Sequence, residues 1–448
     1  MMRWLYSAAL WASQPLLRRK LRQRAQSEPL YGDSVEERFG AYDSPRAVPA
    51  AGASAQPLVW LHAVSLGETR AAAALVDALR IELPGMRLLL THGTATGRAA
   101  GVGLLRTGDQ QVWQPWDTVA TVRRFLRHFQ PTVGLLMETE IWPNLVAECA
   151  REGVPLCLVN ARLSGKSLRQ AQRLAWLARP AYRGLRAVWA QSEADAQRLR
   201  QLGAPVQAVM GNFKFDLNPD AQQLAKGQAW RGQTEKPVLM FASLREGEDA
   251  LLLEFFKQNR PLALVDTAQV APENIVNGTT GKPTQWLIVP RHPQRFDAMA
   301  QQLEQSGLTV SRRSDWSDGP VAADVWLGDS VGEMALYFGL ADAALLGGSF
   351  APLGGQNLIE AAACGVPVFM GPHVFNFEEA AALSVAAGAA FACANLPQAV
   401  HQAIELMSQP EGLAASRAAA LTMGGAHRGA ALRTAQAVAA LLAQPQIR

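Results

Sequence analysis

Short apolar runs alternate with stretches of helical periodicity along most of this 448-residue chain, and that alternation limits the fold more than any other feature. Apolar runs of about five residues are typical of buried parallel strands, and the helical stretches between them are typical of crossover connections. The pattern therefore predicts an α/β protein built on parallel sheets. The predicted strands are residues 58–62, 88–91, 133–137, 156–159, 187–190, 206–210, 238–242, 286–289, 325–327, 343–346, 366–370 and 389–392.

The alternation stops once, near the middle of the chain, in a polar segment rich in glutamine. This segment divides the chain into two α/β halves of similar size, so we expect two Rossmann-like domains joined by a linker. We also expect residues 266–284, which interrupt the second half, to form a surface insertion. The expected organisation is an N-terminal segment at 1–30, a first domain at 31–216, a linker at 217–235, a second domain at 236–425 and a C-terminal helix at 426–448.

Positive charge is concentrated at the N-terminus. The whole chain has a net charge of +4, but residues 1–30 alone hold six basic residues and one acidic residue. A protein that binds nucleic acid over its whole surface would spread its basic residues along the chain, so we expect no nucleic-acid partner. The four cysteines lack the C-x-x-C spacing of a zinc or redox site, which favours a reducing compartment.

An uncharged stretch, residues 4–17, precedes the basic cluster RRKLRQR. This stretch is too short for a helix that crosses a bilayer, which takes about 20 residues. Trp4, Tyr6 and Trp11 suit the headgroup region, and the basic cluster suits anionic lipid. We therefore expect an interfacial anchor on the cytoplasmic face of a membrane. A helix packed on the body of the protein and a single short span are the alternatives.

Charged residues follow several predicted strands of the first domain, at the edge where parallel sheets bind ligands. Glu68 is a candidate general base, although a carboxylate at that helix start could serve only as a helix cap. Glu138 and Glu140 follow a buried strand and need a cation, a ligand or solvent; the structural alternative is that one pairs with an arginine and the other caps the helix. Lys214 lies between two phenylalanines and suits a developing negative charge, unless it pairs with Asp216.

The second domain carries a glycine-rich loop, GGQ at 354–356, that leads into a helix beginning near Asn357. A loop with few side chains before a helix is typical of a phosphate site, and Glu360 one turn later could bind ribose hydroxyls. The sequence contains no G-x-G-x-x-G, no Walker A motif and no D-x-D, and the missing D-x-D disfavours metal-clamped nucleotide-sugar chemistry. We therefore expect neither a metal ion nor a cofactor.

These motifs together resemble those of the 3-deoxy-D-manno-octulosonic acid (Kdo) transferase family of lipopolysaccharide synthesis. The resemblance covers nearly the whole chain, including the apolar and basic N-terminal segment. The motifs that carry it are Ser65–Glu68, Met137–Asn144, Asn160–Ser164, Lys214–Asp216, Pro290–Pro293, Gly332-Glu333, Gly347–Ser349, Asn357–Ala362 and Gly371–Phe377. One departure is Gln356, which stands where many members of the family have histidine.

The resemblance implies a GT-B fold, in which two Rossmann-like domains flank an interdomain cleft. It implies inverting, metal-independent transfer of Kdo from CMP-Kdo to the tetraacylated lipid A precursor, at the cytoplasmic face of the inner membrane. The first domain would bind the acceptor and the second would bind CMP-Kdo. Glu68 would be the general base, and Glu138 and Lys214 would stabilise the transition state. The CMP contacts would be Pro290, Arg291, Val331, Gly332, Glu333, Asn357, Leu358, Ile359 and Glu360.

Two other functions fit the same fold. A GT-B glycosyltransferase that uses a UDP-sugar would saturate with UDP-sugars and not with CMP-Kdo. A non-catalytic nucleotide- or lipid-binding membrane protein would have no use for Glu68, Glu138 and Lys214 together, so their presence in one chain favours an enzyme.

Overall fold

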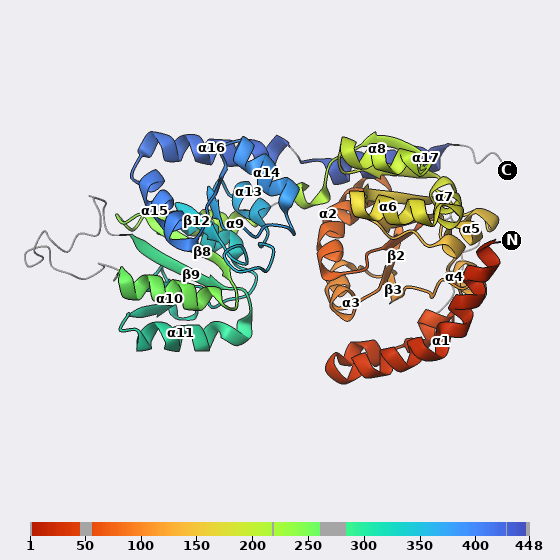
Figure 1. Cartoon of the computed structure of the whole chain (residues 1–448), viewed down its shortest axis with the longest axis horizontal. Helices are drawn as coiled ribbons and strands as arrows, with labels where there is room; N and C mark the ends of the chain where they lie inside the picture. The colour runs from red at the N-terminus through yellow and green to blue at the C-terminus, as the bar shows by residue number, and fades with distance from the viewer. Residues whose placement is uncertain (1, 45–55, 217–218, 260–283, 427, 445–448) are drawn as a thin grey trace, which may run out of the picture. The chain divides into compact units, whose positions relative to one another are not determined.

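The computed structural model describes residues 2–44, 56–216, 219–259, 284–426 and 428–444. The chain divides into two compact units: Met1–Asp216 together with His427–Arg448 make unit 1, and Leu217–Ala426 make unit 2 (Figure 1). Residues 266–283 of the expected insertion lie outside the described residues.

Unit 1 is built on a seven-stranded parallel sheet with the strand order β3-β2-β1-β4-β5-β6-β7. The order runs one way from β1 to β3 and the other way from β4 to β7. The topological switch point, where such sheets bind ligands, therefore lies between β1 and β4. The strands are β1 Leu58–His62, β2 Arg87–His92, β3 Gln110–Trp113, β4 Val133–Met137, β5 Leu156–Ala161, β6 Ala187–Ala190 and β7 Val206–Val209.

Helices bury both faces of this sheet, which explains why its strands read as continuous apolar runs. In β1, Trp60 packs into one core cluster while Val59 and Leu61 pack into the other, as a period of two residues requires. The helices of the first face are α4 Val119–Phe129, α5 Pro143–Arg151, α6 Gly165–Arg173, α7 Ala175–Arg183 and α8 Glu193–Gln201; those of the second are α2 Leu66–Glu82 and α17 Ala430–Ala443, and α3 Ala95–Gly101 follows β2.

Unit 2 is built on another seven-stranded parallel sheet, with the order β10-β11-β9-β8-β12-β13-β14. Its switch point lies between β8 and β12. The strands are β8 Val238–Leu244, β9 Gln285–Pro290, β10 Val310–Arg312, β11 Val325–Leu327, β12 Ala343–Leu346, β13 Val368–Met370 and β14 Ala390–Ala392. The helices are α9 Ala221–Arg231, α10 Glu248–Gln258, α11 Phe296–Gln305, α12 Met334–Leu340, α13 Leu358–Ala363, α14 Glu378–Ala386, α15 Leu396–Met407 and α16 Pro410–Ala426.

The N-terminal segment forms one helix, α1 Met2–Ser27. One side of α1 is docked on unit 1, where the Tyr6 hydroxyl donates a hydrogen bond to the Asp117 carboxylate at 2.8 Å. The other side leaves Trp4 and Trp11 70% and 71% exposed. Among the described residues, no helix has both the length and the apolarity that crossing a membrane requires.

Some elements differ from the sequence-based expectations. The strands β3 and β10 were not predicted, and both lie at sheet edges. Residues 221–231, expected within a linker, form α9 in unit 2. A Cβ atom on Gly227 would lie 2.1 Å from the carbonyl oxygen of Leu336, so α9 approaches α12 closely because position 227 has no side chain.

Candidate active site

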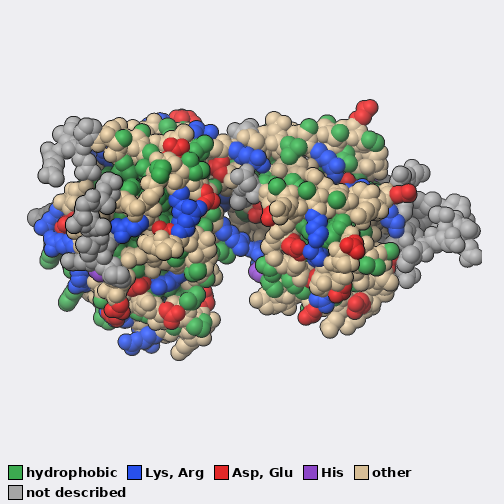
Figure 2. Space-filling view, turned by 180° about the vertical axis from the view of Figure 1, so that it is seen from behind, with side chains coloured by type: hydrophobic (Ala, Val, Ile, Leu, Met, Phe, Trp, Pro, Cys, Tyr) green, Lys and Arg blue, Asp and Glu red, His purple; other side chains and the backbone are tan. Residues whose placement is uncertain are grey.

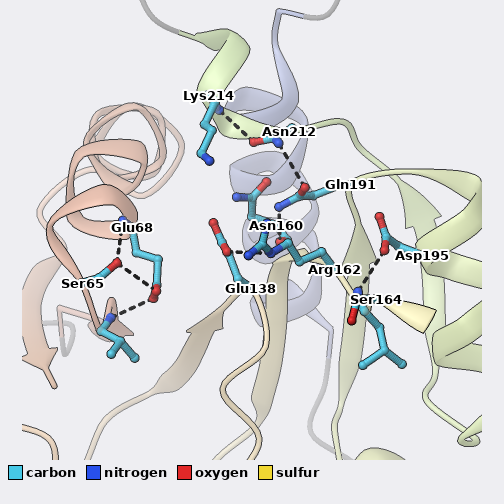
Figure 3. Close-up of polar contacts among 12 residues, drawn as sticks. Ser65, Glu68, Glu138, Asn160, Arg162, Ser164, Gln191, Asp195, Asn212 and Lys214 are labelled. Carbon is cyan, nitrogen blue, oxygen red and sulfur yellow. Dashed lines mark hydrogen bonds and ion pairs between the residues drawn. The ribbon is translucent and has the colours of Figure 1, made fainter. Parts of the chain in front are cut away.

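The loops that follow β1 and β4 lie at the switch point of unit 1, and the first of them positions Glu68 (Figure 3). Helix α2 begins directly after Ser65, whose hydroxyl oxygen accepts the backbone N–H of Glu68 at 3.3 Å. The Glu68 carboxylate in turn accepts the backbone N–H of Val64 at 2.8 Å and the Ser65 hydroxyl at 3.1 Å. This reciprocal arrangement is a variant of the capping box, and it fixes the carboxylate at the ligand-binding edge.

The environment of Glu68 changes its acidity. Burial raises the pKa of Glu68 to about 7, and the negative charges of Glu138 and Glu140 act in the same direction against the hydrogen bonds from Val64 and Ser65. A carboxyl group that titrates near neutrality is matched to accepting a proton from a hydroxyl group. Helix capping and the proposed role as a base are therefore compatible at this position.

Glu138 follows β4 and is buried, with its backbone in the left-handed region at φ 57°. Such a backbone costs a residue with a side chain about 1–2 kcal/mol, and strain of this kind concentrates at functional sites. The carboxylate pairs with the Arg162 guanidinium at an N–O distance of 3.0 Å. Glu140 accepts the indole N–H of Trp142 at 3.0 Å, and burial raises its pKa. The arginine partner considered for this pair of carboxylates is thus present for Glu138.

Lys214 lies in the short 3-10 helix η4, Phe213–Asp216, whose two phenylalanine side chains are buried. Burial lowers the pKa of Lys214, whereas the charges of Glu138 and Glu68 raise it and that of Arg162 lowers it. Lys214, Glu68 and Glu138 therefore belong to one electrostatic cluster, in which the lysine side chain points toward the two carboxylates (Figure 3).

Two amide side chains to which no sequence motif assigned a role, those of Gln191 and Asn212, support this cluster (Figure 3). Gln191 Nε2 donates to the backbone oxygen of Asn160 at 2.9 Å, and Asn212 Nδ2 donates to Gln191 Oε1 at 3.0 Å. The backbone N–H of Lys214 donates to Asn212 Oδ1 at 3.0 Å. Gln191 and Asn212 each follow a strand, β6 or β7, within three residues, which is the signal that could have found them.

In unit 2 the loops at the switch point between β8 and β12 are organised by Glu248, which is fully buried at the start of α10. Its carboxylate accepts the backbone N–H groups of Gly348 at 2.7 Å and Phe350 at 3.0 Å from the loop after β12. It also accepts the backbone N–H of Arg245 at 3.0 Å from the loop after β8. The Glu248 carboxylate is therefore hydrogen-bonded to both the loop after β8 and the loop after β12.

The predicted CMP-binding residues lie on other loops of unit 2. Arg291 follows β9, and its Nε donates to the side-chain oxygen of Gln356 in the glycine-rich loop at 3.1 Å. Asn357 caps α13, because its Oδ1 accepts the backbone N–H of Ile359 at 3.1 Å while its Nδ2 donates to Glu360 at 3.1 Å. Arg291 is thus hydrogen-bonded to the glycine-rich loop, and the residue that follows Gln356 caps the helix.

Glu333 precedes α12 and is held by two partners, the Ser330 hydroxyl and the Arg313 guanidinium, the latter at 2.8 Å. The neighbouring Gly332 has φ 86°, which only glycine adopts without strain, and Val331 is 74% exposed. Pro290, Leu358 and Ile359 are buried.

The structure thus brings the three predicted catalytic residues together in unit 1, and it places the nine predicted CMP contacts in unit 2. Within the described part of the chain, no three His, Cys, Asp or Glu side chains are arranged to hold a metal ion. On the face shown in Figure 2, Lys and Arg side chains are interspersed with acidic, apolar and uncharged ones.

The sequence of this chain is similar to those of known proteins. Residues 33–217 match the family model described as 3-Deoxy-D-manno-octulosonic-acid transferase (kdotransferase). The 3-deoxy-D-manno-octulosonic acid transferase of Bordetella pertussis is 47% identical over 386 residues, which cover 85% of this chain and 86% of that protein. The Haemophilus influenzae protein of the same name is 29% identical over 91% of each chain.

Among solved structures, a glycosyltransferase from Rickettsia africae matches with a TM-score of 0.53 at 11% identity, over 87% of this chain and 100% of that one. This likeness and the two parallel sheets give the protein a GT-B fold. The extent of the match to the Bordetella protein shows that this chain belongs to the Kdo transferase family and is a glycosyltransferase.

Proposed function

We propose that the protein transfers Kdo from CMP-Kdo to the tetraacylated lipid A precursor, with inversion and without a metal ion. The observation that carries this proposal is the cluster at the switch point of unit 1, where a carboxyl group with a pKa of about 7 interacts electrostatically with a half-buried lysine. Within a family of Kdo transferases, such a cluster supplies the two charges that glycosyl transfer to a hydroxyl group needs.

In this proposal Glu68 removes the proton from an acceptor hydroxyl as its oxygen attacks the anomeric carbon of Kdo. The bond from that carbon to the phosphate oxygen breaks, CMP leaves with the bonding electrons, and single displacement inverts the anomeric centre. Lys214 and the Arg162-paired Glu138 stabilise the charges that develop at the reacting carbon. Burial strengthens these interactions because the local dielectric is low.

Unit 2 is the proposed donor site. Arg291 is oriented by Gln356, and a guanidinium group is well suited to the phosphate of CMP. Glu333 and Glu360 are each hydrogen-bonded within the loops that carry them, so their carboxylates are preorganised for ribose and base contacts. In this family many members have histidine at position 356; here an amide positions the arginine instead.

The exposed side of α1 is the proposed membrane contact, at the cytoplasmic face of the inner membrane. Trp4, Leu5, Trp11 and Leu16 are 59–71% exposed, and helical spacing places them on one side of α1 beside Arg19. Exposed aromatic side chains next to cations favour the interface of an anionic bilayer. Anchoring at the interface would raise the encounter rate with a lipid acceptor.

The proposal is tested by incubating the full-length protein with CMP-Kdo and the tetraacylated lipid A precursor and measuring the product mass. We expect the acceptor to gain whole Kdo units, in the presence or absence of EDTA. Parallel reactions with UDP-sugars are expected to give no product. Transfer from a UDP-sugar but not from CMP-Kdo would overturn the donor assignment, and loss of activity in EDTA would overturn metal independence.

A further inference from the structure

Asn160 is hydrogen-bonded to two neighbouring loops of the cluster in unit 1, although it belongs to no charged pair. It is the second-to-last residue of β5 and has a left-handed backbone, φ 49°, at a point where the pairing of β5 with β6 shifts register. Its backbone oxygen accepts Gln191 Nε2, and its side-chain Oδ1 accepts the backbone N–H of Phe213 at 3.1 Å. Asn160 thus fixes the turn that carries Lys214.

The hydrogen bonds of Asn160 determine the orientation of its side-chain amide. Because Oδ1 must face the N–H donor of Phe213, Nδ2 faces the other way. Figure 3 shows Nδ2 on the side of Lys214 and Glu138. Asn160 is 1% exposed, and its Nδ2 has no hydrogen-bond partner among the described residues.

A buried N–H donor without a partner costs about 1–3 kcal/mol, so it needs a physical reason. Gln191 and Asn212, the other amides here, each use both ends of their side chains. The unused donor of Asn160 lies toward the cation that the proposed mechanism already assigns to substrate. An N–H donor beside an ammonium group is a donor set for an anionic oxygen.

Resting on the proposed function, we propose that Asn160 binds the carboxylate of the sugar acid during transfer. Nδ2 donates to a carboxylate oxygen while Lys214 contributes charge, and Oδ1 keeps the lysine turn in place. The carboxylate of Kdo is attached to the reacting carbon, so a group that holds it also orients that carbon toward Glu68. Asn160 is therefore a further substrate-binding residue.

The roles of Oδ1 and Nδ2 of Asn160 can be tested separately by substitution. Asn160→Asp keeps an oxygen for the Phe213 N–H but replaces the Nδ2 donor with a second oxygen. Asn212→Asp makes the same chemical change in the same cluster, but the donor it removes faces Gln191 and not a ligand. Each variant is compared with the wild type in melting temperature, in kcat, and in KM for CMP-Kdo.

For Asn160→Asp we expect kcat/KM for CMP-Kdo to fall by at least about 100-fold, the size of effect seen when one donor to a substrate anion is lost. The loss should include a raised KM, because the carboxylate is present in the bound donor. For Asn212→Asp we expect less than about a tenfold loss, confined to kcat. Both variants should unfold cooperatively within a few degrees of the wild type.

The inference is overturned if Asn160→Asp retains kcat/KM within threefold of the wild type. It is also overturned if the two variants lose activity equally with KM unchanged, because Asn160 would then act only by positioning Lys214. If the wild-type protein transfers nothing from CMP-Kdo, the proposed function fails and the assignment of the sugar acid to Asn160 fails with it.

Discussion

Glu68 illustrates how one side chain can have a structural and a proposed chemical role. Its carboxylate completes the cap of α2, accepting two hydrogen bonds, yet burial leaves its pKa near neutrality. The hydrogen bonds stabilise the charged form and burial disfavours it, and the second effect dominates. The cap therefore fixes the position of the carboxylate without converting it into a permanently ionised group.

This balance predicts the pH dependence of transfer. The base is competent only when deprotonated, so kcat/KM should be low below the pKa and should rise through an inflection at about pH 7. Ser65→Ala removes a hydrogen bond that lowers the pKa, so its inflection should move to higher pH. Above pH 7, where the wild-type base is deprotonated, Glu68→Gln should lose at least about 1,000-fold in rate while CMP binding survives. Measuring kcat/KM from pH 5.5 to 9 for the wild type and both variants checks this pH dependence. An inflection in Ser65→Ala at the same pH as in the wild type would contradict the prediction.

The charged residues of the site were accessible from sequence, whereas the residues that support them were not. Glu68, Glu138 and Lys214 stand directly after predicted strands or inside a distinctive motif. Gln191 and Glu248 act on backbone groups of loops that are distant in the sequence, as in the bond from Gly348 to Glu248 across 100 positions. A place after a strand or at a helix start marks such residues as candidates, but no local pattern identifies their partners, because only the tertiary fold brings the two loops together.

At the scale of elements, the loops after β8 and β12 depend on a single buried carboxylate. Glu248→Gln replaces one oxygen with an N–H group that would face backbone donors. We expect this to cost unit 2 about 3 kcal/mol, or roughly 6–12 °C in melting temperature, and to weaken CMP binding. Glu246→Gln is the matched control, because Glu246 is 53% exposed, and its loss should change stability by less than about 1 kcal/mol. Calorimetry measures the stability of each variant, and CMP titration measures its affinity for CMP. Equal effects in the two variants would refute the role of Glu248 in organising these loops.

The exposed side of α1 predicts membrane binding. Trp4→Ser combined with Trp11→Ser should lower binding to vesicles that contain anionic lipid by at least tenfold, because two interfacial aromatic side chains are lost. Ile81→Ser on α2 is the control, since Ile81 is also 70% exposed but belongs to a different helix. Co-sedimentation measures the bound fraction. Unchanged binding of the double variant would show that another surface supplies the affinity.

Strands that read as apolar runs were predicted well, including the edge strands β7 and β14, whereas two polar edge strands were not predicted. All twelve predicted strands occur within one or two residues of their expected ends. The edge strands β3 and β10, by contrast, carry glutamine, serine and arginine side chains, so they present no apolar run. Helix α9 has an equally polar sequence, and its contact with α12 depends on two glycines, 227 and 339, which give no periodic signal.

At the scale of the whole molecule, the chain crosses between its units twice, after Asp216 and again before α17. Asp216, considered above as a partner for Lys214, accepts the backbone N–H groups of Gly429 and of Ala431, the latter at 2.6 Å. Its carboxylate therefore caps α17. Buried residues of α17 such as Ala435 and Val438 pack into the core shared with α2. The C-terminal helix is thus part of the unit that begins the chain.

This arrangement predicts which fragments fold. Residues 217–426 are contiguous and contain a complete core, so they should give a cooperative thermal transition when expressed alone. Residues 1–216 alone should be insoluble or lack such a transition, because the apolar surface that α17 covers beside α2 would be left exposed. Joining residues 427–448 to residue 216 through a short flexible linker should restore the transition, and Asp216→Ala in that fusion should lower its melting temperature by a few degrees. Calorimetry of the three fragments measures the outcome, and a fragment 1–216 as stable as the fusion would show that α17 contributes little to the core.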